Sequence, residues 1–199
     1  MPRSFLVLVA LLAIAAGSVK GQDYAGPPAL GPFRVDRDVS VDSLFQRLGR
    51  PSSTAENHLC YRSSDGTAFL VLTRMTEDYG PKIAGGVVLS TFRNCVNRLV
   101  TVTPDDLAAW KTAKGIGLSS TADDVRKAYG TPLRVDKVEG DDYRRVIYGD
   151  FVDNHYVKVK RPELGDTVLV YGRAPDDLRI AEFGIREGRV VWIFLSKNE

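Results

Sequence analysis

The segment from 114 to 132 constrains the fold of this chain more than any other stretch; it reads KGIGLSSTADDVRKAYGTP. Thr121 is suited to cap a helix, because its hydroxyl can accept a hydrogen bond from a backbone N–H in the first turn. Two aspartates follow at once, where the helix dipole favours negative charge. Gly130 and Pro132 then end the helix. The segment therefore predicts a short amphipathic helix between Thr121 and Gly130.

A fainter copy of this pattern lies 81 residues earlier in the chain, aligning Ser40 with Thr121. The same shift places Gly49-Arg50-Pro51 on Gly130-Thr131-Pro132. Short capped helices share such residues by chance, but the extra proline and the similar strand patterns after both copies favour a duplication. The expected fold class is α+β, with two repeated units, each made of one or two short helices packed on a small antiparallel sheet.

These patterns divide the chain into five regions. Strands are expected at 58–63 and 67–75 around an Asp65-Gly66 hairpin turn, and at 190–195, a run that is apolar on both faces and is therefore placed at the centre of a sheet. The expected regions are a signal peptide at 1–21, an irregular Pro/Gly-rich leader at 22–37, a first repeat at 38–102, a connector at 103–116 and a second repeat at 117–199.

The first residues resemble an export signal. Arg3 precedes the apolar run FLVLVALLAIAA from Phe5 to Ala16, which is shorter than the roughly 20 residues of a membrane-spanning helix. A small-x-small cleavage pattern follows at Ala16-Gly17-Ser18. An uncleaved N-terminal anchor is the alternative. We expect an exported protein, periplasmic or secreted, with no transmembrane anchor after cleavage.

Charge argues against a nucleic-acid partner. The chain has 27 basic and 25 acidic residues, and removal of 1–21 takes away Arg3 and Lys20, which leaves the two signs equal. A neutral chain with interspersed signs lacks the basic surface that nucleic acids require.

The two cysteines, Cys60 and Cys95, are expected to form a disulfide, because an even count in an exported chain favours pairing. On the chain-entropy model, a bridge over this separation stabilises the fold by roughly 3–4 kcal/mol. Two separately buried thiols are the alternative.

No catalytic, cofactor-binding or metal-ligating residue is predicted. Asp150, Asp153, Asn154 and His155 form the densest group of potential metal ligands, but Asp and Asn in a turn more often bond their own backbone. Tyrosines gather in the second half of the chain. On an exposed sheet face they would form an interaction surface, and under the helix they would be core; these residues are Tyr143, Tyr148, Tyr156 and Tyr171.

Three short motifs carry a resemblance to a known superfamily: Cys60 to Thr67 (CYRSSDGT), Gly115 to Leu118 (GIGL) and Tyr129 to Pro132 (YGTP). With the repeated helix and meander, they resemble the beta-lactamase-inhibitor-like superfamily, whose single-copy relative is the outer-membrane assembly lipoprotein of the SmpA/OmlA type. The chain is most similar to exported bacterial proteins of this kind that have no assigned function. The resemblance implies binding to other proteins of the cell envelope or extracellular space.

The function expected from the sequence is that of an exported, non-enzymatic protein-binding module. The partner would be another envelope or extracellular protein, and no cofactor is expected. A small secreted, hydrolase-like enzyme is the alternative; a compact cluster of titratable groups in one pocket would favour it.

Overall fold

The structure is a computed structural model that describes residues 29–34, 39–51, 58–75, 82–93, 100–138, 161–172 and 179–197. Its helices are α1 (Val41–Leu48), the 3-10 helix η1 (Leu107–Ala109), α2 (Ala122–Tyr129) and α4 (Arg161–Leu164). Its strands are β1 (Ala29–Leu30), β2 (Phe33–Arg34), β3 (Val39–Ser40), β4 (His58–Ser63), β5 (Phe69–Met75), β6 (Lys82–Ser90), β7 (Thr101–Thr103), β8 (Arg134–Lys137), β9 (Thr167–Gly172), β10 (Arg179–Arg186) and β11 (Arg189–Lys197).

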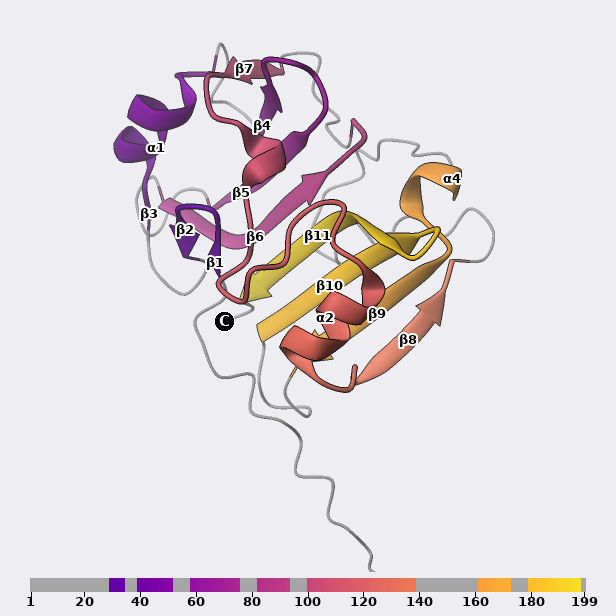
Figure 1. Ribbon diagram of the computed structural model, residues 1–199. Coiled ribbons are helices and arrows are strands. Elements are labelled where there is room, and N and C mark those ends of the chain that lie inside the picture. Colours follow the sequence, from indigo (N-terminus) through magenta and orange to yellow (C-terminus); the bar gives the residue numbers. More distant parts are fainter. Residues whose placement is uncertain are drawn as a thin grey trace, which may run out of the picture.

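One twisted sheet runs through the whole molecule (Figure 1). Eight strands lie in the order β7-β4-β5-β6-β11-β10-β9-β8, and β3 joins by pairing with β6. Neighbours are antiparallel except β7, which runs parallel to β4. A separate hairpin, β1–β2, lies within the segment that we expected to be irregular.

The expected fold class is wrong in its architecture, because the two halves of the chain share one sheet. Strand β6, from the first half, pairs with β11, from the second, with Leu89 opposite Ile193 and Val87 opposite Leu195. Both strands are apolar on both faces, so each must be covered above and below and paired on both edges. Two small sheets would expose the β6 and β11 edges to water; their pairing removes both edges.

Strand β11 lies at the centre of this sheet, between β6 and β10, as its two-sided apolar pattern predicted. Ile193 and Leu195 belong to the core on one face, whereas Trp192 belongs to the core on the other. Alternate residues of a strand point to opposite faces, so a strand with two apolar faces contributes to two cores at once.

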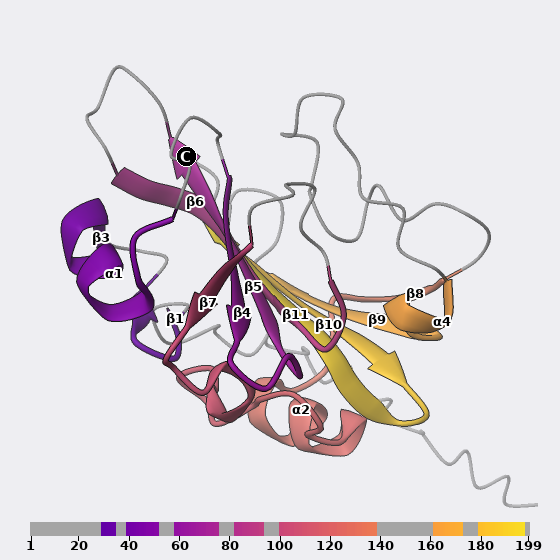
Figure 2. The same cartoon turned by 90° about the horizontal axis from the view of Figure 1, so that it is seen from above.

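The first face of the sheet is covered by helices and by the connector (Figure 2). Leu44 and Leu48 of α1 and Val125 of α2 are buried in the same core as sheet residues. The segment expected as a connector, 103–116, belongs to this layer, since Leu107, Trp110 and Ile116 are buried in it. The second face carries a smaller core. Its buried residues come from β9, β11 and α4 and from the segments after β6 and β8, namely Phe92, Val138, Leu164, Val168, Val170, Val191 and Trp192.

Helices α1 and α2 end in the same way. Each is followed by a glycine in the left-handed region, Gly49 at φ 92° and Gly130 at φ 82°, which a side chain would strain. A buried tyrosine of the sheet donates its hydroxyl to each glycine carbonyl: Tyr61 to Gly49 at 3.2 Å and Tyr171 to Gly130 at 3.4 Å. The helix and stop expected at 121–132 and its earlier counterpart are therefore confirmed as local structures.

Gly184 of β10 tests how tightly the second face is packed. A Cβ built at Gly184 collides with the Trp192 indole, whose N–H donates to the Leu164 carbonyl at 2.8 Å. We expect Gly184→Ala to lower the free energy of unfolding by about 2–3 kcal/mol, as overpacking does, measured by urea unfolding. At Gly115 a Cβ meets no atom but φ is 82°, so Gly115→Ala is expected to cost only about 1 kcal/mol. Equal losses in the two variants would contradict tight packing at Trp192.

Candidate interaction surface

The tyrosines predicted as an interaction surface do not provide one among the described residues. Tyr143, Tyr148 and Tyr156 lie outside the described ranges. Tyr171 is buried on the helix-covered face, with its ring centroid 5.3 Å from that of Tyr129 and 5.9 Å from that of Phe183. Burial raises the pKa of its phenol. Tyr171 is therefore a core residue beneath α2.

The exposed large hydrophobic side chains of the described residues lie mostly at one edge of the sheet. Leu133 is 62% exposed and Val135 is 52% exposed, both at strand β8; Val102, on β7 at the opposite edge, is 50% exposed. We call Leu133, Arg134, Val135, Asp136 and Lys137 the β8 edge. No described strand pairs with β8 on the side away from β9, and Figure 1 shows β8 as the last arrow of the sheet.

The fold places β8 at the edge through the turn that ends α2. Gly130 stops the helix, Pro132 prevents its continuation, and the Leu133 N–H donates to the Val170 carbonyl at 2.9 Å. The chain then runs antiparallel to β9, with Arg134 opposite Val170 and Val135 opposite Leu169. The helix stop that the sequence predicts therefore also positions the edge strand.

The N–H and C=O groups along β8 point alternately toward β9 and away from it. The Val138 N–H donates to the Asp166 carbonyl at 3.1 Å, and this bond brackets the pair Lys137–Thr167. In an antiparallel ladder, opposite residues alternate between hydrogen-bonded and non-hydrogen-bonded pairs. Lys137 and Thr167 form a non-hydrogen-bonded pair, so the N–H and C=O of Lys137 point away from β9. Val135 is two residues away, so its N–H and C=O also point outward, away from β9. The β8 edge thus offers a backbone donor and acceptor beside an exposed apolar side chain.

Side chains of the β8 edge separate by face. Val135 lies opposite Leu169, a residue of the helix-covered core, whereas Arg134 and Asp136 lie opposite Val170 and Val168, residues of the second core. The Arg134 Nε–H donates to the Asp136 carboxylate at 2.7 Å, with the two side chains 49% and 35% exposed. Water screens an ion pair at this exposure, so it adds little stability. Both charges are thus available to a partner.

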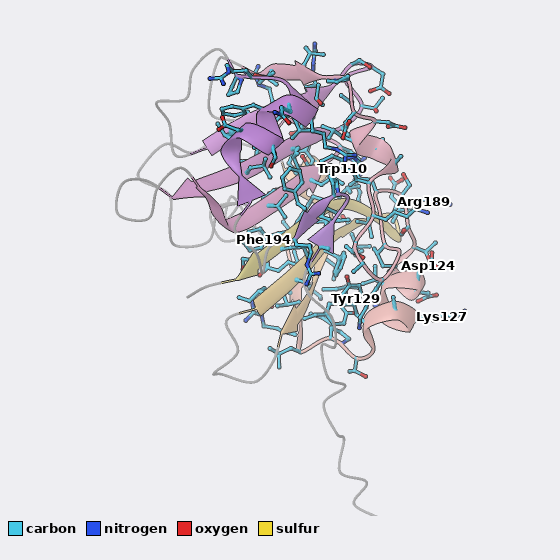
Figure 3. All side chains as sticks on the ribbon, turned by 90° about the vertical axis from the view of Figure 1, so that its left-hand side faces the viewer. Trp110, Asp124, Lys127, Tyr129, Arg189 and Phe194 are labelled. Carbon is cyan, nitrogen blue, oxygen red and sulfur yellow. The ribbon has the colours of Figure 1, made fainter. Side chains whose placement is uncertain are left out.

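The outer surface of α2 is a second polar region, and its polar groups bond to one another. Thr121 and Asp124 form the capping box: the Thr121 hydroxyl accepts from the Asp124 N–H at 3.1 Å and donates to the Asp124 carboxylate at 2.7 Å. Asp124, Lys127 and Arg189 point outward here, whereas Tyr129 points beneath the helix (Figure 3). The hydrogen bonds from Thr121 lower the pKa of Asp124. Thr121 and Asp124 therefore stabilise the start of α2 and do not form a binding site.

The cysteines remain partly outside the described residues. Cys60 is buried on the second face with Val71 and Val88, and no described cysteine is free. Cys95 lies outside the described ranges. Pairing of Cys60 with Cys95 stays a prediction.

Other candidate residues from the sequence are not brought together. His155, Asp150, Asp153 and Asn154 lie outside the described residues. In the part of the chain that the structure describes, no three of its His, Cys, Asp and Glu side chains are grouped to hold a metal ion. Nor is any described helix both long and apolar enough to cross a membrane. The signal peptide expected at 1–21 also lies outside the described part.

Comparisons with known proteins add little. No family model matches this chain, and no curated protein matches it. Among solved structures, a DUF4309 family protein (YjgB) from Bacillus subtilis is similar over 84% of this chain and 83% of that chain, with 12% identity and a TM-score of 0.41. A likeness this low carries no argument about fold or function. These comparisons do not address the resemblance to beta-lactamase-inhibitor-like proteins.

Sequence reasoning missed the β8 edge. The sequence predicts a helix end at Gly130 to Pro132 and no element at 133–137, because the exposed strand is four residues long and its Arg-Val-Asp-Lys sequence resembles a polar loop. The alternation of Leu133 and Val135 with charged residues is a period-two pattern typical of a strand with one apolar side, and it was the available signal.

The capping box provides a test of local electrostatics. Because hydrogen bonds hold the pKa of Asp124 below its ordinary value, its stabilisation is present above the unfolded-state pKa and is lost as the pH falls through the folded-state pKa. We expect Thr121→Ala to raise the pKa of Asp124 toward its ordinary value, followed by NMR titration of the side-chain carboxyl carbon. Thr131→Ala, an exposed threonine beyond the helix, is the control. An unchanged Asp124 titration in Thr121→Ala would contradict the assigned cause.

The disulfide prediction has a direct readout. Oxidised mature protein, unfolded without reductant, should take up no thiol-alkylating reagent, whereas reduced protein should take up two equivalents, measured by intact mass. Cys60→Ala should leave one reactive thiol, at Cys95. Alkylation of both thiols without reductant would show that Cys60 and Cys95 are separate.

Proposed function

We propose that this chain is an exported, non-enzymatic protein-binding module, and that its binding site is the β8 edge. An extended segment of a partner protein would pair with β8 and lengthen the sheet. The observation that carries the proposal is that no described strand pairs with the outer side of β8, where the backbone of Val135 faces outward beside the exposed side chains of Leu133 and Val135.

Strand addition suits what the β8 edge offers. Main-chain hydrogen bonds provide affinity in this binding mode, and alternate side chains provide specificity. The outward N–H and C=O of Val135 provide the main-chain hydrogen bonds. The exposed Val135 side chain on one face and the Arg134–Asp136 pair on the other provide the specificity. Natural proteins usually protect open edges with lysines, prolines or bulges. Here Lys137 protects only the end of the strand, and Val135 stays exposed.

The first face and the interior strands of the sheet are already occupied. The first face packs under α1, α2 and the connector, and the interior strands are paired on both sides. The opposite edge, β7, has three residues and one exposed apolar side chain, Val102. The β8 edge is therefore the larger apolar edge among the described strands.

Export, to the periplasm or the extracellular space, is part of this proposal and rests on the N-terminal sequence. The basic start, the 12-residue apolar run and the small residues at 16–18 support a signal peptide. The partner is then a protein of the same compartment, as the resemblance to envelope-binding proteins also suggests.

The alternative, a secreted hydrolase-like enzyme, has less support. Two of the described ion pairs serve the fold: Arg47 with Asp105 at 2.8 Å and Arg126 with Asp123 at 3.1 Å. Asp105 joins α1 to the connector, and Asp123 lies in the first turn of α2. One pair joins two elements and the other lies within α2, and this structural use of the carboxylates supports the binding module over the enzyme.

Affinity capture with edge variants tests this proposal. Tagged protein lacking residues 1–21 would be cross-linked in its own envelope or secreted fraction, and bound proteins identified by mass spectrometry. We expect a stoichiometric protein partner with the unaltered chain, and its loss with Val135→Lys, which places a charge on the apolar side of the edge. Val102→Lys is the matched control, because Val102 and Val135 are equally exposed but lie at opposite edges.

Two results would contradict the proposal. Retention of the same partner by Val135→Lys would place the binding site elsewhere. Absence of any retained protein and of any cross-linked second copy of the chain, with gentle washing, would argue against a binding module and favour screens for enzymatic activity.

A further inference from the structure

We infer that the strand received by the β8 edge is β8 of a second copy of this chain, paired antiparallel about a two-fold axis at Val135. This inference rests on the proposed function, since it names the partner of the same edge. Its basis is the order of side chains along the edge, Leu133-Arg134-Val135-Asp136-Lys137, which is complementary to itself.

Charge complementarity selects this register. With Val135 opposite Val135 of the second copy, Arg134 of each copy lies opposite Asp136 of the other, so two opposite-charge pairs form across the axis. Directly opposed charges of opposite sign stabilise an antiparallel pair, and like charges destabilise it. Both side chains reach the surface in the single chain, so each can exchange its partner within the chain for one across the axis.

Backbone geometry agrees with the same register. The N–H and C=O of Val135 point away from β9, so the two copies of Val135 can exchange two hydrogen bonds as a bonded pair. Arg134 and Asp136 then form the non-bonded pairs on either side, in which opposing side chains come closer together. The ion pairs therefore fall at the positions where contact across the axis is shortest.

The other two-fold axes within β8 place like charges together. An axis at Arg134 sets two arginines opposite each other, an axis at Asp136 sets two aspartates, and an axis at Lys137 sets two lysines. Two-fold symmetry requires a residue on the axis to face itself, because backbone direction alternates along each strand. Val135 is the residue of β8 that can face its own copy across the axis without opposing two like charges.

The apolar face supports the same arrangement. Val135 lies on the side of the sheet that α2 covers, opposite Leu169 of the core. Pairing about Val135 brings the two exposed valines together on this face. The dimer would thus join two nine-stranded sheets into one and extend both first-face cores across the axis.

Charge complementation between variants tests the register. Arg134→Asp leaves two acidic side chains on the edge, and Asp136→Arg leaves two basic ones. Each variant alone should dimerise about tenfold more weakly or worse than the unaltered chain, because two opposite-charge pairs become like-charge pairs. An equimolar mixture of the two should recover dimers that contain one copy of each variant. Sedimentation equilibrium over a range of protein concentrations measures this.

The mixture separates an interface from a role within the chain. Both variants lose the Arg134–Asp136 ion pair of the single chain, and mixing cannot restore it. Recovery on mixing therefore requires contact between copies. The inference is overturned if the unaltered chain is monomeric at all concentrations, if the single variants dimerise as the unaltered chain does, or if the mixture does not recover.

A backbone variant guards against misfolding of the charge variants. Val135→Pro removes an N–H that points outward, so it breaks no bond to β9, and proline is tolerated at such edge positions. It should abolish dimers while circular dichroism and the unfolding midpoint stay close to those of the unaltered chain. Persistence of dimers in Val135→Pro would also overturn the inference.

These results distinguish this inference from the proposed function. A chain that is monomeric but loses a captured protein in Val135→Lys would keep the β8 edge as a binding site and reject the second copy as its occupant. A dimer that survives every edge variant would reject both the register and the edge.

Discussion

The pairing of β6 with β11 is the interaction on which the rest of this structure depends. Each strand carries apolar residues on both faces, so neither can lie at an edge without exposing large side chains to water. Their five-residue register, from Trp192–Ser90 to Ser196–Gly86, joins the two halves of the chain into one sheet. Unpairing these strands would expose the central residues of both cores.

This central pairing also determines where binding can occur. Because the interior edges meet each other, the described sheet ends only at β7 and β8. Helices, the connector and the β1–β2 hairpin cover one face. The ring centroids of Trp110, in the connector, and Phe33, in the hairpin, lie 5.5 Å apart. The exposed apolar residues are consequently displaced to the sheet edges, and β8 carries most of them. Open backbone and exposed apolar side chains then coincide on one short strand.

Local patterns could be read from the sequence, but the pairing of distant strands could not. Thr121, Asp124 and Gly130 predicted α2 with its cap and stop, and the apolar run 190–195 predicted a central strand. The partner of that strand, β6, lies about a hundred residues away, and no local signal selects it over an edge within its own half. The apparent repeat of helix and Gly-x-Pro therefore suggested two sheets where there is one.

The candidate site was missed for a related reason. Tyrosines were expected to mark a surface, yet Tyr171 is buried because its strand lies beneath α2. A short edge strand with alternating charges differs from a loop only once its neighbour, β9, is known. Whether a residue is interior or at an edge is decided by the order of strands, which a single sequence does not contain.

Amide hydrogen exchange at β8, resolved by NMR at several protein concentrations, tests the central claim most directly. Val138 donates to Asp166 within the chain, so its amide should be protected at every concentration. The Val135 amide points outward and should exchange rapidly in dilute protein, then become protected as the concentration rises. A Val135 amide whose exchange does not depend on concentration would contradict pairing of this edge with a second copy. Protection of that amide even in dilute protein would contradict the open edge itself.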